Sequence, residues 1–395
     1  MMIEHRHETG VENVLVLQGG GSLGAFACGV IKAFAKKNIK FDIIAGTSIG
    51  GINGAIAAGS INDKPEKDLE DFWLELARSS YNIIPDSFSF DFDYHKNQAK
   101  LKRSPAASLN AAFFGVPGFF VPRWFPLNNS TSESSEIKEF VQPPWKWTYV
   151  YDNYPLTKTI EKFIDFKKLS PPSQQNNTDN GIRKGNTRLI ITAVDVLTAE
   201  PLMFDSYKMH IGMKHLLATI GYPQYGFPWV EIGDGKFAWD GSLLSNTPIR
   251  EVMVASPHKD KNIFVVENYP KKIEKLPANM SEVMSRAKDI MFTDKTQSLI
   301  KMSRLITRHV NLIEALYDIF ETSDHSKIDK DKIDYIIKEH STLVEKHGAK
   351  ILKLHRITRN IPETQYSLQN ADFSVATIKE LIKQGETKVF DYLKQ

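Results

Sequence analysis

The segment VLVLQGGGSLGAF, from Val14 to Phe26, constrains this chain more than any other. Four apolar residues predict a buried strand, three glycines end it, and small residues then open a helix. Backbone N–H groups at a glycine-rich turn before a helix are suited to binding an anion. That anion is either a nucleotide phosphate or the oxyanion that forms when an ester is attacked.

A second segment, FDIIAGTSIGG, repeats the order of strand, turn and helix from Phe41 to Gly51. Two such units in close succession predict an α/β fold with a mostly parallel central sheet. Further strands are expected at Leu189–Asp195 and Ile263–Val266, and a hairpin at Trp229–Gly241 that turns at Asp234 and Gly235.

The second turn contains G-x-S-x-G, with Ser48 between Gly46 and Gly50. A nucleophile elbow holds its serine in a strained conformation, and flanking glycines relieve the crowding around it. Ser48 also precedes a helix, whose N-terminus favours developing negative charge. Because Gly19, Gly20 and Gly21 end the neighbouring strand, we expect their N–H groups at the same sheet edge, as an oxyanion hole.

A dinucleotide site is the competing interpretation, because Gly19, Gly21 and Gly24 spell G-x-G-x-x-G after a strand. The acid that binds a ribose belongs at the end of the second strand, whereas Asp42 stands at its beginning. A P-loop is excluded, since no Gly-Lys-Ser or Gly-Lys-Thr follows the glycines.

A serine nucleophile needs a base, and Asp240 is the candidate. It follows the predicted hairpin in WDGSLLSNTPI and precedes a polar cluster at Asn246–Pro248. A Ser-Asp-His triad would instead use His258, which lies in the polar stretch ASPHKDKN and is expected to be a solvent-exposed loop residue. No histidine has the spacing of a metal ligand, so no metal site is expected.

GGGSLGAF, GTSIGG and DGSLLSNTPI together resemble the patatin-like phospholipases, which carry a glycine loop, G-x-S-x-G and Asp-Gly in this order. The resemblance implies a three-layer α/β fold and a lipid acyl hydrolase that uses a Ser–Asp dyad and no cofactor. It makes Ser48 the nucleophile, Asp240 the general base and Gly19–Gly21 the oxyanion loop. The chain departs from the family at Ser242, where Gly or Ala is usual, and at Ser22-Leu23, where many members carry a basic residue.

The resemblance implies an acyl hydrolase domain at residues 1–255, interrupted by an insertion or cap at 84–184. Residues 256–395 are then expected to hold the end of the core sheet and a helical C-terminal extension. This extension includes a heptad-like stretch from Ile333 to His355. Segments such as RAKDIMFTDKT resemble longer bacterial members of the family.

The insertion contains the aromatic stretch AAFFGVPGFFVPRWF. Two interpretations stay open: a lid or acyl-chain site that touches lipid or a membrane interface, and a cap that only packs on the core. The candidate substrate-binding residues are Phe113, Phe114, Phe119, Phe120 and Trp124, with Phe125 in the same stretch.

Composition narrows the remaining classes. A formal charge of +3 over 395 residues does not favour nucleic acid as a partner. Cys28, the single cysteine, excludes an intramolecular disulfide and is expected in the core. Without an apolar leader or long apolar segment, a cytoplasmic protein that touches membranes only peripherally is expected. A catalytically weak lipid-binding or scaffold protein is the alternative function, and a homo-oligomer stays open.

Overall fold

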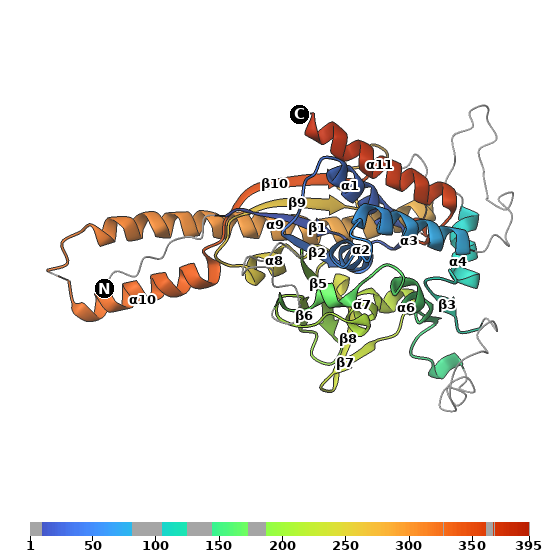
Figure 1. Ribbon diagram of the computed structural model, residues 1–395, viewed down its shortest axis with the longest axis horizontal. Coiled ribbons are helices and arrows are strands. Elements are labelled where there is room, and N and C mark those ends of the chain that lie inside the picture. The colour runs from blue at the N-terminus through green and yellow to red at the C-terminus, as the bar shows by residue number, and fades with distance from the viewer. Residues whose placement is uncertain are drawn as a thin grey trace.

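The computed structural model describes residues 10–80, 105–124, 144–172, 187–326, 328–360, 366 and 368–394. Within these residues, eight strands form the main sheet in the order β10-β9-β1-β2-β5-β8-β7, with β6 paired to β5 beside this path (Figure 1). The strands are β1 Glu12–Leu17, β2 Ile43–Thr47, β5 Arg188–Asp195, β6 Pro201–Asp205, β7 Val230–Gly233, β8 Lys236–Asp240, β9 Lys261–Glu267 and β10 Ile351–Thr358.

The five strands from β10 to β5 are mutually parallel, whereas β6 and β8 run antiparallel to β5, and β7 runs antiparallel to β8. The predicted α/β fold with a mostly parallel sheet is therefore confirmed. The main helices are α1 Ala25–Lys36, α2 Ile49–Ala58, α3 Pro65–Ser79, α4 Pro105–Phe114, α6 Pro155–Ile160, α7 Met213–Ile220, α8 Ile249–Ala255, α9 Met280–Glu321, α10 Lys330–His347 and α11 Val375–Leu393.

Helices cover both faces of the sheet, which explains the continuous apolar run in β1. Leu15 and Leu17 pack with α1, α2, α3 and α11 in the larger core cluster. Val14 and Val16 point to the other face and pack with Ile249 and its neighbours on α8. The sheet therefore has a layer of helices on each face, and these two layers bury the alternating side chains of β1.

Local turn chemistry places the hairpin where it was predicted. β7 and β8 are joined by Asp234 and Gly235, whose φ angles of 53° and 68° are both positive. This is the left-handed backbone that a tight two-residue hairpin turn requires. Cys28 is fully buried in α1, and the desolvation that follows raises the pKa of its thiol, as expected of a residue that only packs.

The heptad-like stretch from Ile333 to His355, assigned from the sequence to a mostly helical extension, is only partly helical. α10 ends at His347, and Ile351–Thr358 forms strand β10 at the edge of the main sheet. The strand pairs in parallel with β9, from Ile351 beside Lys261 to Thr358 beside Glu267. The edge of β9 supplies the hydrogen-bond partners that favour a strand here, a non-local effect that helical spacing cannot reveal.

The C-terminal helix α11 belongs to the core, because it packs on α1 through facing glycines. A Cβ atom added at Gly29 would lie 1.9 Å from the carbonyl oxygen of Ile382, and one at Gly385 would lie 2.2 Å from that of Phe26. Lys32 adds an ion pair across this junction, with its Nζ 2.7 Å from Glu70 on α3 and 3.0 Å from Glu386 on α11. None of the described helices combines the length and apolar content needed to cross a bilayer.

We predict that Gly385→Ala destabilises the protein by about 1–3 kcal/mol, because the added methyl group must push α11 away from the backbone of α1. In an open helix the same change would stabilise by up to about 1 kcal/mol. Thermal unfolding followed by circular dichroism measures the difference, with the exposed α11 position Lys383→Ala as the control. A melting temperature for Gly385→Ala at or above that of the unsubstituted protein would contradict the close contact.

Candidate active site

Ser48 lies in the turn between β2 and α2, at the carboxyl edge of the parallel strands. Its φ of 57° and ψ of −134° place a residue with a side chain in a backbone region that costs about 1–3 kcal/mol. The side chain is half-buried and faces a cavity. This is the backbone strain expected of a nucleophile elbow.

The elbow glycines are required by close approach of backbone to backbone. A Cβ atom at Gly46 would lie 2.3 Å from the carbonyl carbon of Gly50. A Cβ atom at Gly50 would lie 2.3 Å from the carbonyl oxygen of Leu17, the last residue of β1. The turn can therefore sit against the ends of both strands only if these two residues have no side chain.

Two threonines stabilise the turn at Ser48 through hydrogen bonds, and the sequence analysis did not identify them. The Ser48 N–H donates to Oγ1 of Thr219 over 3.0 Å, and that hydroxyl donates to the carbonyl of Thr192 over 2.7 Å. Thr219 on α7 is fully buried. No local pattern marks these threonines, because α7 and β5 meet the elbow only in the folded chain.

The glycine loop follows β1 and lies beside the elbow, since Leu17 is in register with Gly46 of β2. Gly20 and Gly21 have φ angles of 155° and 56°, and both line the cavity that contains Ser48. The Gly19 N–H instead donates to Oδ1 of Asn246 over 3.0 Å. Of the three loop glycines, Gly20 and Gly21 are therefore the two that line the cavity.

Asparagine side chains fix the glycine loop. Nδ2 of Asn268 donates to the carbonyls of Gln18 and Gly19, each over 3.1 Å. The backbone N–H of Asn268 donates to Oε1 of Gln18. Asn246 belongs to the polar cluster noted after Asp240, but its role in holding Gly19 depends on a contact across 227 residues.

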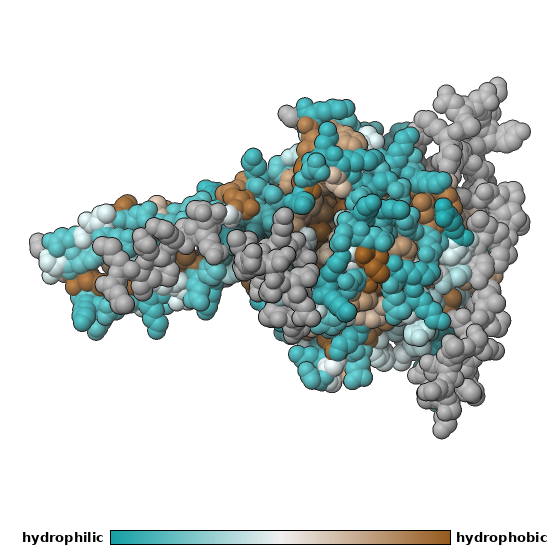
Figure 2. All heavy atoms as spheres, in the orientation of Figure 1, coloured by the Kyte–Doolittle hydropathy of each residue, from teal (hydrophilic) through white to brown (hydrophobic). Residues whose placement is uncertain are grey.

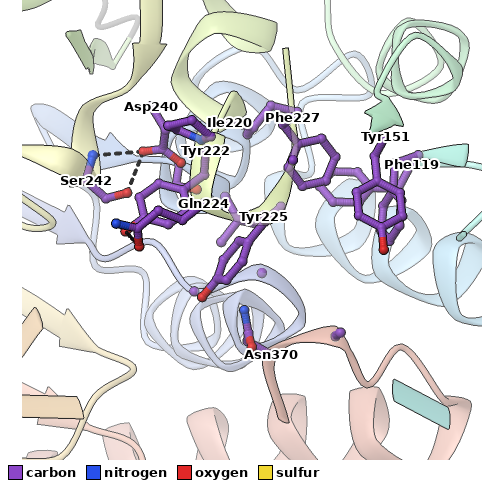
Figure 3. Close-up of a pocket in the computed structure, with 18 of the residues that line it drawn as sticks. Phe119, Tyr151, Ile220, Tyr222, Gln224, Tyr225, Phe227, Asp240, Ser242 and Asn370 are labelled. Atoms are coloured by element: carbon purple, nitrogen blue, oxygen red, sulfur yellow. Dashed lines mark hydrogen bonds between the residues drawn. The ribbon is translucent and has the colours of Figure 1, made fainter. Parts of the chain in front are cut away.

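Asp240 ends β8 and is fully buried. Its Oδ1 accepts two hydrogen bonds from Ser242, one from the N–H and one from the hydroxyl, each over 2.8 Å (Figure 3). No side chain of the described residues makes a regular hydrogen bond to Oδ2. Burial raises the pKa of the carboxyl to about 6, against the opposing effects of the Ser48 hydroxyl and the Ser242 donors.

Ser48, Asp240, Gly20 and Gly21 line one cavity of about 560 Å³. Its walls are mainly apolar and aromatic, and Figure 3 shows Tyr222, Tyr225, Phe227, Tyr151 and Phe119 along them. The segment before α11 closes another side with Asn370, Ala371 and Phe373. Sequence reasoning missed the walls at 222–227 and 368–373, which carry no catalytic motif.

The predicted aromatic substrate residues divide into two groups. Phe119 and Phe120 line the cavity and are buried. Phe113 and Trp124 are 55% and 48% exposed, and neither they nor the half-buried Phe114 belong to the cavity lining. Only part of the stretch therefore lines the cavity, and Phe125 lies outside the described residues.

The residues of the two alternative sites, a dinucleotide site with Asp42 and a Ser-Asp-His triad with His258, do not lie together. Asp42 precedes β2, at the opposite end of the strand from the glycine loop, and its Oδ2 accepts from the N–H of Asn13 over 2.7 Å. His258 is exposed in the loop before β9, again at the end of the sheet away from Ser48. No cluster of three or more metal-ligating side chains occurs within the described ranges.

The sequence profile of the patatin-like phospholipases matches residues 15–253. Lysophospholipase nte1 of Aspergillus terreus is 57% identical over 154 residues, which cover 38% of this chain and 10% of that protein. Lysophospholipase NTE1 of Coccidioides immitis is 28% identical over 158 residues, 38% of this chain and 9% of that protein, so the chain spans about a tenth of these relatives' length. The solved structure of VipD from Legionella pneumophila aligns with a TM-score of 0.33 and 12% identity, over 96% of this chain and 67% of that one. Because the family profile covers more than half of its residues, this chain belongs to the patatin-like phospholipase family.

Proposed function

We propose that this protein is a lipid acyl hydrolase that cleaves carboxylic esters through Ser48 and Asp240. One observation carries the proposal: a serine in a strained turn and a fully buried carboxylate, far apart in sequence, line the same largely apolar cavity. Membership of a family of phospholipases supports this assignment, as do the lysophospholipase names of the curated relatives.

In the proposed reaction, the ionised Asp240 takes the proton of the Ser48 hydroxyl, and the serine oxygen attacks the ester carbonyl. The oxyanion that forms accepts hydrogen bonds from the N–H groups of Gly20 and Gly21. Asp240 then returns the proton to the departing alcohol, which leaves an acyl-serine. Water, deprotonated by the same aspartate, attacks the acyl-serine, and Asp240 then returns this proton to the Ser48 oxygen as the fatty acid leaves.

The cavity walls support a substrate with an apolar acyl chain. Phe119, Phe120, Phe227 and Phe373 present rings to the space beside Ser48, where an alkyl chain would be removed from water. Lysophospholipids, which carry one chain, are the first class to test because the curated relatives bear that name. A non-hydrolytic lipid-binding protein on the same fold is the alternative, and the labelling experiment below separates the two.

We predict that a fluorophosphonate probe forms one adduct per chain, detected by intact mass. Ser48→Ala should form none, and Asp240→Asn should react at least about 100-fold more slowly, since a general base contributes roughly 10²–10⁴-fold. Circular dichroism of each variant checks that the fold is retained. An adduct on Ser48→Ala would place the nucleophile elsewhere, and an unreactive wild type that binds lysophospholipid would favour the binding protein.

The raised pKa of Asp240 predicts an acidic limb in the pH dependence of kcat/KM. The general base must be ionised, so activity should fall as pH decreases through about 6. Ser242→Ala removes a donor that favours the carboxylate, which raises the pKa of Asp240 and shifts this limb to higher pH. We expect kcat/KM of Ser242→Ala to be roughly tenfold below that of the wild type at pH 5.5, given the usual strength of hydrogen bonds to charged groups. At pH 8 the difference should be smaller.

Ser79→Ala is the matched control for Ser242→Ala, because the Ser79 hydroxyl donates to the carbonyl of Leu76 at the end of α3. Its pH profile should coincide with that of the wild type. An unmoved acidic limb in Ser242→Ala would show that the hydroxyl does not act on Asp240.

We predict that Phe120→Leu lowers kcat/KM for octanoyl esters relative to butyryl esters by about three- to tenfold, because part of the acyl-chain wall is lost. Trp124→Leu, outside the cavity, should leave the ratio unchanged for soluble esters. If Trp124→Leu lowers activity only on vesicles, the exposed ring contacts the membrane interface. Equal losses for both chain lengths in Phe120→Leu would contradict an acyl-chain site.

A further inference from the structure

Helices α9 and α10 form an arm that projects from the body of the protein (Figure 1). α9 has 42 residues, and α10 returns beside its second half. The rings of Tyr317 and His340 stack with centroids 3.5 Å apart, and Val310 is 2% exposed. Lys350 pairs with Glu314 near the point where the arm rejoins the sheet. One side of α9 is therefore covered by α10.

Another side of α9 carries apolar residues that nothing in the described chain covers. Figure 2 shows hydrophobic patches between hydrophilic side chains on the arm. The residues that we call the arm stripe are Met302, Leu305, Leu312, Leu316 and Ile319, each at least 45% exposed. So many large exposed apolar side chains in one row indicate a surface that meets a partner.

The spacing of the arm stripe indicates that the partner is a helix. With the exposed His309 included, the positions 302, 305, 309, 312, 316 and 319 advance by alternating steps of three and four residues. This heptad spacing keeps one seam of a helix in contact with another helix along its whole length. It is independent of the contact with α10, which uses Val310 and Tyr317.

The stripe is also complementary to itself. The alternating steps read the same from either end, so an antiparallel copy places Met302 opposite Ile319, and Leu305 opposite Leu316. Such a pairing is isologous, with the same patch used by both copies. A parallel pairing would satisfy the heptad spacing equally well, so a feature other than the spacing must decide the direction.

Charge is segregated along the exposed arm. Lys301, Arg304 and Arg308 lie in the half nearer the body, whereas Asp318 and Glu321 lie near the tip. At helical spacing, however, Asp318 and Glu321 fall on the side of α9 opposite the arm stripe, so these charges do not meet across the seam. Size decides the direction instead: antiparallel copies place their bodies at opposite ends of the paired arms, whereas parallel copies would crowd two bodies, each wider than the arm, at one end (Figure 1). A lipid surface fits this arm less well. Helices that lie on a membrane surface carry an excess of Lys and Arg, whereas the four Lys residues of α10 are balanced by four Asp and Glu residues.

We propose that two copies of this chain associate through their arms, with the second half of α9 antiparallel to its counterpart about a two-fold axis near residues 310–311. The arm stripes then bury one another, and each tip lies beside the base of the partner's arm. The proposal does not depend on the catalytic assignment, since no arm-stripe residue lines the cavity.

Light scattering coupled to size-exclusion chromatography of the 395-residue chain tests the association. The wild type should have twice the chain mass of 44.8 kDa, and Leu305→Glu/Leu316→Glu should have the mass of one chain with an unchanged circular dichroism spectrum and melting temperature. Met284→Glu/Ile290→Glu replaces exposed apolar residues of α9 outside the stripe and should remain a dimer. A wild type that stays monomeric at 100 µM, or a dimer that survives the stripe substitutions, overturns the proposal.

Cysteine pairing tests the direction of the helices, because the native Cys28 is fully buried. A mixture of Leu305→Cys and Leu316→Cys chains should form the mixed disulfide dimer under mild oxidation, while neither variant alone should cross-link efficiently. Cross-linking of Leu305→Cys with itself would mean parallel arms. A monomeric wild type whose binding to anionic vesicles is abolished by Leu305→Glu/Leu316→Glu would assign the stripe to a membrane instead.

Discussion

The contact on which the site depends is the backbone of α2 against the ends of β1 and β2. Gly50 lies against the carbonyl of Leu17, and Gly46 lies against Gly50, at distances that leave no room for a Cβ atom. This contact forces the chain through the strained conformation of Ser48 and points its side chain out of the sheet edge. The same edge holds the glycine loop, so Ser48 and the loop glycines lie at one end of the parallel strands.

A buried carboxylate beside this edge creates the second constraint. Asp240 lies at the end of an antiparallel strand, fully removed from water, and burial raises its pKa toward neutrality. Ser242 moderates that effect by donating two hydrogen bonds to one carboxylate oxygen. The other oxygen is left without a regular hydrogen bond from a described side chain, which suits the general base that we propose Asp240 to be. Burial thus increases the basicity of the Asp240 carboxylate, and the hydrogen bonds from Ser242 keep the carboxylate ionised near neutral pH.

The region after residue 256 does more than extend the hydrolase fold. β9 lies inside the parallel sheet between β1 and β10, and α11 packs on α1 through glycine contacts. The segment before α11 supplies Asn370 and Phe373 to the cavity wall. Within the part of this region that the structure describes, the arm of α9 and α10 extends away from the body, and no described residue covers its exposed heptad stripe.

Short-range signals determined much of this protein from its sequence alone. The strand–turn–helix units, the Asp234–Gly235 hairpin and the elbow around Ser48 follow from apolar periodicity and from glycines at turns, and both are properties of adjacent residues. The tertiary structure decided what distant segments supply: the commitment of Gly19 to Asn246, the exclusion of Phe113 and Trp124 from the cavity, and the strand β10 in a helix-like pattern. Each of these depends on a hydrogen-bond partner or a packing surface far away in sequence, which no local pattern contains.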